Sequence, residues 1–147
     1  VTEKRKKIYD FTYPYYRSGQ IVVVGSKAGI YNMESLFGKI IYVQKGSTGA
    51  EMAETIPGAR LRLVDDFQDV VGLMDNGEPV AIVTDRALAD YYRQQRGFMT
   101  VGSPLSYEEI AILLAKGCPI LRVSLNEALR ELSEKGEIRR LREKWNL

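Results

Sequence analysis

The segment Pro79–Gln95, PVAIVTDRALADYYRQQ, passes from a short apolar run into a stretch with helical spacing. The run Val80–Val83 is wholly apolar, which is typical of a strand buried on both faces of a sheet. The stretch Arg86–Gln95 that follows is expected to be helical. A buried strand followed by a helix of about ten residues is the repeating unit of a parallel α/β sheet.

The same alternation continues on both sides of this segment. Further strands are expected at Gln20–Gly25, Lys39–Gln44, Arg60–Val64 and Phe98–Val101, and further helices at Ser47–Thr55 and Asp66–Met74. We therefore predict an α/β fold in which Gly38–Ser103 forms a self-contained, mainly parallel sheet covered on both faces. Beyond it, Tyr107–Ala115 is expected to be extended, and Leu121–Trp145 to form two helices separated at Gly136.

The composition removes several classes of function. The 147 residues include no histidine and one cysteine, Cys118. Serine–histidine and cysteine–histidine catalysis are therefore excluded, as are an internal disulfide and a cysteine-based zinc site. No metal or cofactor is expected. The net charge of +2 is small and the two basic clusters carry interleaved glutamates, so we expect no nucleic-acid partner.

A glycine-rich turn with two hydroxyls is the first candidate binding feature. The residues Lys45–Gly49, KGSTG, stand between the strand at 39–44 and the next helix. Ser47 and Thr48 are thus expected at a helix N-terminus, where unpaired N–H groups favour an anion. In an open α/β sheet, ligands bind beyond the carboxyl ends of strands. The alternative is that Ser47 is only an N-cap.

The second candidate is Asp85, which directly follows the buried strand. Taken alone, it is explained as the N-cap of the helix that begins at Arg86. Together with Ser47 and Thr48, it places a carboxylate and an anion site at one edge, which matches the two charged ends of an α-amino acid. Arg5 could bind a carboxylate through its planar guanidinium, although nothing local separates it from the neighbouring lysines.

Four segments resemble a known family. The run TEKRKKIYDFTYPYYRSGQIVVV, residues 2–24, resembles the part of type II periplasmic binding proteins that closes the first lobe, with a T-x-x-R element and an F-[ST]-x-P-Y turn. The runs at 35–54 and 79–92 resemble the start of the second lobe and the strand that ends in a ligand-binding aspartate. Residues 125–145 resemble the family's C-terminal helices. One departure is Tyr13, where many relatives have an acidic residue.

The resemblance implies a role for each candidate residue. Arg5 would clamp the ligand's α-carboxylate, Thr48 with Ser47 beside it would hold the same carboxylate, and Asp85 would accept the α-amino group. It implies residues 1–25 as a first-lobe remnant with a hinge strand, 26–105 as the second lobe, and 106–147 as the return strand and C-terminal helices. Most of the first lobe is expected to be absent.

The function implied is amino-acid binding for ABC-type uptake or for sensing, in the periplasm or another extracytoplasmic space. The expected partners are an amino acid and a permease or receptor domain. Two alternatives stay open. One is a dehydratase-like enzyme on the same scaffold, with Glu51 or Glu109 as general acid or base, and the other is a fragment that binds nothing.

The terminal segments carry apolar residues that the predicted sheet does not cover. They are Ile8, Phe11, Leu125, Leu129, Leu132 and Leu141. An exposed patch of this size is unusual for a soluble monomer. We expect the segments to pack on each other in an arrangement foreign to the family, or to be buried by a second copy, with exchange of the C-terminal helices as one route. Trp145 is expected to pack the last helix down.

Overall fold

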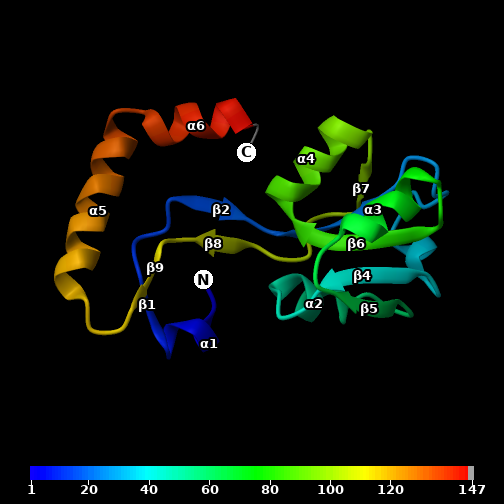
Figure 1. The fold of residues 1–147 in the computed structure, drawn as a ribbon, viewed down its shortest axis with the longest axis horizontal. Helices are drawn as coiled ribbons and strands as arrows, with labels where there is room; N and C mark the ends of the chain where they lie inside the picture. Colours follow the sequence, from blue (N-terminus) through cyan, green and yellow to red (C-terminus); the bar gives the residue numbers. More distant parts are fainter. Residues whose placement is uncertain (146–147) are drawn as a thin grey trace. The chain divides into compact units, whose positions relative to one another are not determined.

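The computed structural model describes residues 1–145 and divides into two compact units (Figure 1). The larger unit is Gly19–Tyr107, and the smaller one combines Val1–Ser18 with the chain from Glu108 onward. The sequence-based boundaries, 1–25, 26–105 and 106–147, differ from these at both crossings. The first boundary differs because the strand at 20–24 belongs to the sheet of the larger unit, and the second differs by two residues. The assignment of these units to lobes stays a prediction.

One five-stranded sheet organises the larger unit. Its strands, in spatial order, are β5 (Arg60–Val64), β4 (Ile40–Gln44), β6 (Val80–Asp85), β3 (Gln20–Val24) and β7 (Met99–Val101). β4 pairs in parallel with β5 and β6, whereas β3 pairs antiparallel with both β6 and β7. The α/β class is confirmed, and the sheet is mixed.

The expectation of a self-contained parallel sheet from Gly38 to Ser103 is therefore wrong in one respect. The sheet includes β3, which lies between β6 and β7 and runs antiparallel to both. The reason lies in the connection: only a 3-10 turn, η1 (Glu34–Leu36), interrupts the loop from β3 to β4. Successive parallel strands are usually joined by a helical crossover, and the connection from β3 to β4 contains no α-helix.

Helices cover both faces of this sheet (Figure 1). The helix α2 (Thr48–Ala53) packs on one face, and α3 (Gln68–Asp75) and α4 (Arg86–Arg96) pack on the other. Side chains alternate along β3, so that Val22 and Val24 belong to the α2 side while Ile21 and Val23 belong to the α3 and α4 side. All five residues of β3 are buried, as a central strand between two cores requires.

The two ends of the larger unit lie side by side. The backbone N–H of Gln20 donates to Ser106 Oγ at 3.0 Å, and the N–H of Leu105 donates to the carbonyl of Gln20 at 2.7 Å. A Cβ added to Gly19 would lie 2.0 Å from the carbonyl oxygen of Ser106, so only glycine fits at this approach. The chain therefore enters and leaves the unit at one place.

The smaller unit is built from short paired strands and helices. Its elements are α1 (Glu3–Lys6), β1 (Tyr9–Phe11), β2 (Tyr16–Ser18), β8 (Glu108–Ile110), β9 (Leu113–Ala115), α5 (Pro119–Glu134) and α6 (Glu137–Trp145). β1 pairs with β9 and β2 with β8, both antiparallel. Gly136, at φ +73°, separates α5 from α6, which confirms the predicted break.

Little of the smaller unit is buried. Among its described residues, Leu114 is the one hydrophobic residue that is buried, and α5 and α6 bury none. Trp145 is 65% exposed, so the prediction that it packs the last helix down is wrong. Leu132 and Leu141 are also exposed, and packing of the terminal segments on each other does not cover them. Of the helices described, none has both the length and the apolar character that a bilayer crossing requires.

Candidate functional site

Ser47 stands at the turn between β4 and α2, and its hydroxyl both donates and accepts a hydrogen bond within that turn. Its Oγ accepts a hydrogen bond from the N–H of Ala50 at 3.2 Å and donates to the carbonyl of Gln44 at 2.7 Å. Ser47 is therefore the N-cap of α2, as the simpler sequence interpretation held. Its hydroxyl hydrogen is already engaged within the turn.

Thr48 is the first residue of α2, and its hydroxyl has a different partner. The side-chain amide of Gln20 donates from Nε2 to Thr48 Oγ1 at 3.1 Å. A threonine hydroxyl holds one hydrogen and two lone pairs, so accepting this bond leaves the hydrogen for another acceptor. Of the two predicted hydroxyls, Thr48 is thus the better placed to donate to a carboxylate.

Asp85 ends β6 and caps α4. Its Oδ1 accepts from the N–H of Leu88 at 3.1 Å. The adjacent Arg86 pairs with Asp90, and within residues 1–145 no ion pair involves Asp85. A carboxylate has more acceptor positions than one N–H can fill, so Asp85 can cap the helix and also accept from an ammonium group.

Gln20 connects these residues across the sheet. It is the register partner of Asp85 in the β3–β6 pair, and its side chain bonds to Thr48. Side chains along β6 alternate, and Asp85 has the same parity as Ala81 and Val83, which pack on the α2 side. Gln20 has the parity of Val22 on that side. The structure therefore brings a hydroxyl donor and a carboxylate to one edge of the larger unit.

Arg5, the remaining predicted site residue, belongs to the smaller unit. It lies in the four-residue helix α1, where its backbone N–H is capped by Thr2 Oγ1 at 3.3 Å. Its side chain is exposed, and among the ion pairs of residues 1–145 none includes it. The neighbouring Lys6 is instead paired with Glu3 at 2.7 Å.

In α1, which contains Arg5, the hydrogen bond between Lys6 and Glu3 lowers the pKa of Glu3 and raises the pKa of Lys6. Two further shifted pKa values lie away from the predicted site residues. A hydrogen bond from Lys116 lowers the pKa of Asp10, where β1 meets the end of β9. Burial raises the pKa of Tyr92, whose ring lies 5.9 Å from that of Phe98. In the part of the chain that the structure describes, no cluster of three acidic or cysteine side chains is arranged to hold a metal ion.

The chain matches one protein family along its whole length. Residues 1–147 match the bacterial extracellular solute-binding proteins, family 3. The chain belongs to this family. The type II periplasmic binding protein fold predicted from the sequence is thereby confirmed, since solved amino-acid-binding proteins share the fold.

Relatives of this chain are amino-acid-binding proteins by name. The L-cystine-binding protein TcyJ of Escherichia coli K12 is 32% identical over 155 residues, which cover 99% of this chain and 56% of TcyJ. A solved ancestral arginine-binding protein bound to arginine is 34% identical, with a TM-score of 0.83 over 99% of this chain and 67% of its own. An ancestral amino acid-binding protein, described as a precursor of cyclohexadienyl dehydratase, is 29% identical with a TM-score of 0.85, over 99% and 65%.

The matches cover nearly all of this chain but only part of each relative. The chain spans little more than half of the length of the curated relatives it matches, 54% to 56% for two of them. What their names state about ligands applies to those proteins.

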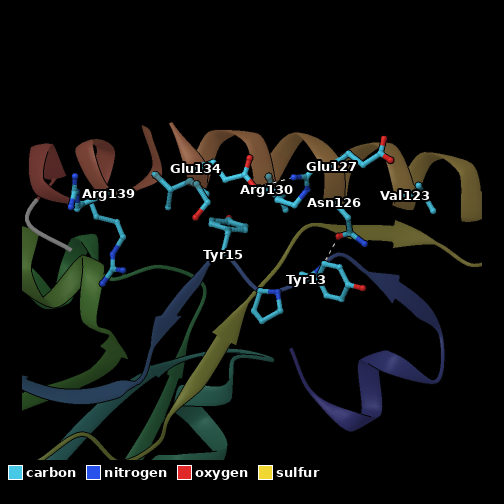
Figure 2. Close-up of a pocket in the computed structure, with 13 residues that line it drawn as sticks. Tyr13, Tyr15, Val123, Asn126, Glu127, Arg130, Glu134 and Arg139 are labelled. Carbon is cyan, nitrogen blue, oxygen red and sulfur yellow. Dashed lines mark hydrogen bonds and ion pairs between the residues drawn. The ribbon is translucent and has the colours of Figure 1, made fainter. Parts of the chain in front are cut away.

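A separate groove of about 710 Å³ lies within the smaller unit. Figure 2 shows that Tyr13 and Tyr15 face the helix α5 across it, with Val123, Arg130 and Glu134 projecting from that helix. The backbone N–H of Tyr13 donates to Asn126 Oδ1 at 2.8 Å, which ties the turn to α5. None of the four predicted site residues lines this groove.

The sequence did not single out Gln20, which the structure adds to the candidate site. It was assigned only to a strand, yet it is 6% exposed and bonds to a predicted ligand-binding residue. One signal was present: a polar residue opens the otherwise apolar run QIVVV. A buried amide needs a hydrogen-bond partner, so such a residue indicates a second polar group nearby.

Proposed function

We propose that this chain binds an α-amino acid at the edge of the larger unit formed by Thr48 and Asp85. The observation that carries the proposal is that a hydroxyl group and a carboxylate group both lie at that edge. Gln20 bonds to the Thr48 hydroxyl, which accepts that bond, and is the register partner of Asp85, whose carboxylate has no ion-pair partner among residues 1–145. The hydroxyl suits a ligand carboxylate and the Asp85 carboxylate suits an ammonium group.

Arg5 is proposed as the third contact, a planar donor for the α-carboxylate. The family match supports this role, because the T-x-x-R element falls within it. The cystine-binding and arginine-binding relatives support an amino acid as the ligand class. Binding would serve ABC-type uptake or sensing, with a permease or receptor domain as partner, in the periplasm or another extracytoplasmic space.

We expect the affinity of the isolated chain to be weaker than about 1 µM, which corresponds to about −8 kcal/mol. Arg5 sits on a four-residue helix in a unit that buries one described hydrophobic side chain, so ordering it costs part of the binding free energy. Isothermal titration or NMR titration with the twenty L-amino acids and cystine tests the proposal. Binding tighter than 1 µM by a monomer would contradict this expectation.

Thr48 and Ser47 should contribute unequally to that affinity. Thr48→Val removes the hydrogen that the ligand carboxylate would accept, and we expect a loss of about tenfold or more, since hydrogen bonds to charged groups contribute about 1.5–3 kcal/mol. Ser47→Ala removes a helix cap and should lower the free energy of unfolding by about 1 kcal/mol with little change in affinity. Titration and urea denaturation of both variants measure the two effects. Equal losses of affinity for the two variants would contradict the prediction that the ligand contacts Thr48 rather than Ser47.

A second function has one observation in its favour, the likeness to the precursor of cyclohexadienyl dehydratase. The glutamates considered for acid–base chemistry are weakly supported. Glu109 pairs with Arg17 at 3.6 Å, and Glu51 is exposed on the first turn of α2. Incubation with a cyclic prephenate-type acid, followed by product analysis, would reveal such an activity.

We also propose that a second copy of the chain covers the smaller unit. Its exposed apolar residues include Ile120 at 82%, Leu121 at 53% and Leu132 at 44%. Sedimentation should show a dimer or larger species, and the double variant Leu121→Asp, Leu132→Asp should shift it towards monomer because a charge at the interface is costly to desolvate. The matched control is Leu63→Asp, since Leu63 is 59% exposed in the larger unit. A monomeric wild-type chain at tens of micromolar would contradict the proposal.

A further inference from the structure

Gln20 is a buried amide that opens the central strand of the larger unit. It is 6% exposed, and its four successors in β3 are apolar and buried. Its Nε2 donates to Thr48 Oγ1 at 3.1 Å across to the first residue of α2. Burying an amide costs free energy unless it is bonded, so this contact fixes both groups.

The direction of this bond decides what Thr48 can do. Because the amide nitrogen is the donor, Thr48 Oγ1 is the acceptor, and its hydrogen must point elsewhere. Ser47 shows the opposite case, since its hydrogen goes to the carbonyl of Gln44. Of these two adjacent hydroxyls, the Thr48 hydroxyl is therefore the one whose hydrogen can be donated to a ligand.

Gly49 makes room for the amide. A Cβ at this position would lie 2.7 Å from Gln20 Oε1 and 3.1 Å from the carbonyl oxygen of Val83. The missing side chain therefore leaves the space that the oxygen end of the amide occupies. Gln20 is held between the first turn of α2 and the carboxyl end of β6, with its nitrogen directed at Thr48.

We propose that Gln20 is a positioning residue for ligand binding, acting through Thr48. By donating to Thr48 Oγ1, it orients the hydroxyl so that its hydrogen is presented to the carboxylate of an amino acid. Gln20 itself need not touch the ligand. The inference rests on the proposed amino-acid binding and names the residue that prepares one of its contacts.

A double-mutant cycle tests this role. The single variants are Gln20→Met, which keeps length and removes the donor, and Thr48→Val, which removes the hydroxyl. Each is titrated by NMR with the twenty L-amino acids, one at a time. We expect Gln20→Met to weaken binding about threefold to tenfold, the equivalent of one neutral hydrogen bond. In the Thr48→Val background the same substitution should change the dissociation constant less than twofold, because no hydroxyl is left to orient.

A merely structural role would give another pattern. If Gln20 supported only the local fold, Gln20→Met would weaken binding by the same factor in both backgrounds, and the inference would be overturned. Gly49→Ala serves as a second variant, since it keeps Gln20 and Thr48 and displaces the amide. It should reproduce the affinity loss of Gln20→Met, even if the latter folds poorly.

The two levels of the proposal fail differently. A folded wild-type chain that binds none of the twenty amino acids overturns the proposed function, and this inference with it. A wild-type chain that binds an amino acid, with Gln20→Met and Gly49→Ala both binding equally well, overturns the inference alone.

Discussion

Replacing Asp85 with asparagine should weaken amino-acid binding by at least a hundredfold. The substitution keeps the size of the side chain and removes the charge that would face the ligand's ammonium group. Losing one partner of a desolvated charge pair costs about 3–5 kcal/mol, and each 1.4 kcal/mol is about tenfold in the dissociation constant. Titration of the wild type and Asp85→Asn with the same amino acid measures the ratio.

The fold should survive this change, because asparagine caps helices as well as aspartate does and can accept from the N–H of Leu88. Thermal denaturation should therefore give similar midpoints. The carboxylic acid that lacks the amino group is the matched ligand control, and both proteins should bind it equally weakly. Asp85→Ala should also weaken binding far more than Ser47→Ala does. Small and equal effects would mean that Asp85 and Ser47 are helix caps only.

The largest effect on stability is expected from Ile82→Ala. Ile82 is fully buried in β6, the strand between β4 and β3, and packs with Phe67 and Met74. Truncation to alanine removes apolar contacts and leaves a cavity, which typically costs about 2–5 kcal/mol. Urea denaturation followed by circular dichroism should show a lower midpoint with an unchanged slope.

Leu132→Ala is the control for this substitution. Leu132 is 44% exposed on α5, and a surface substitution usually changes the free energy of unfolding by less than about 0.5 kcal/mol. A loss below 1 kcal/mol for Ile82→Ala would contradict the described core. A large loss for Leu132→Ala at high protein concentration would instead support burial of α5 by a second copy.

Local pattern was enough to predict most elements of the larger unit. The strand Arg60–Val64 has the bounds that were expected, and α4 extends one residue beyond them. Periodicity reports which residues of a segment share a face, and these segments follow it closely. The position of β3 could not be predicted in this way, because four consecutive apolar residues fit any central place in a sheet. Its partners are set by contacts far apart in sequence.

The candidate site was predicted in outline and not in its hydrogen bonds. Residue type and position relative to the strands were sufficient to select Thr48 and Asp85, and the family resemblance added Arg5. The difference between Ser47 and Thr48 depends on which carbonyl or amide lies within hydrogen-bond distance of each hydroxyl, 2.7 Å for Ser47 and 3.1 Å for Thr48. Such distances follow from the tertiary fold, as does the contact that brings Gln20 into the site. The exposure of Trp145 was missed for the same reason.

The meeting of Gly19 and Ser106 has a consequence for how the chain folds. Pairing β2 with β8 in the smaller unit requires the ends of about ninety intervening residues to come together, and the loop-closure entropy of such a segment is roughly 4 kcal/mol. Once the larger unit has formed, its own packing holds Gly19 beside Ser106 and has already met that entropic cost. The strands β2 and β8 then extend from neighbouring points of the chain and pair without closing a long loop. Folding should therefore proceed from the larger unit outward to both termini.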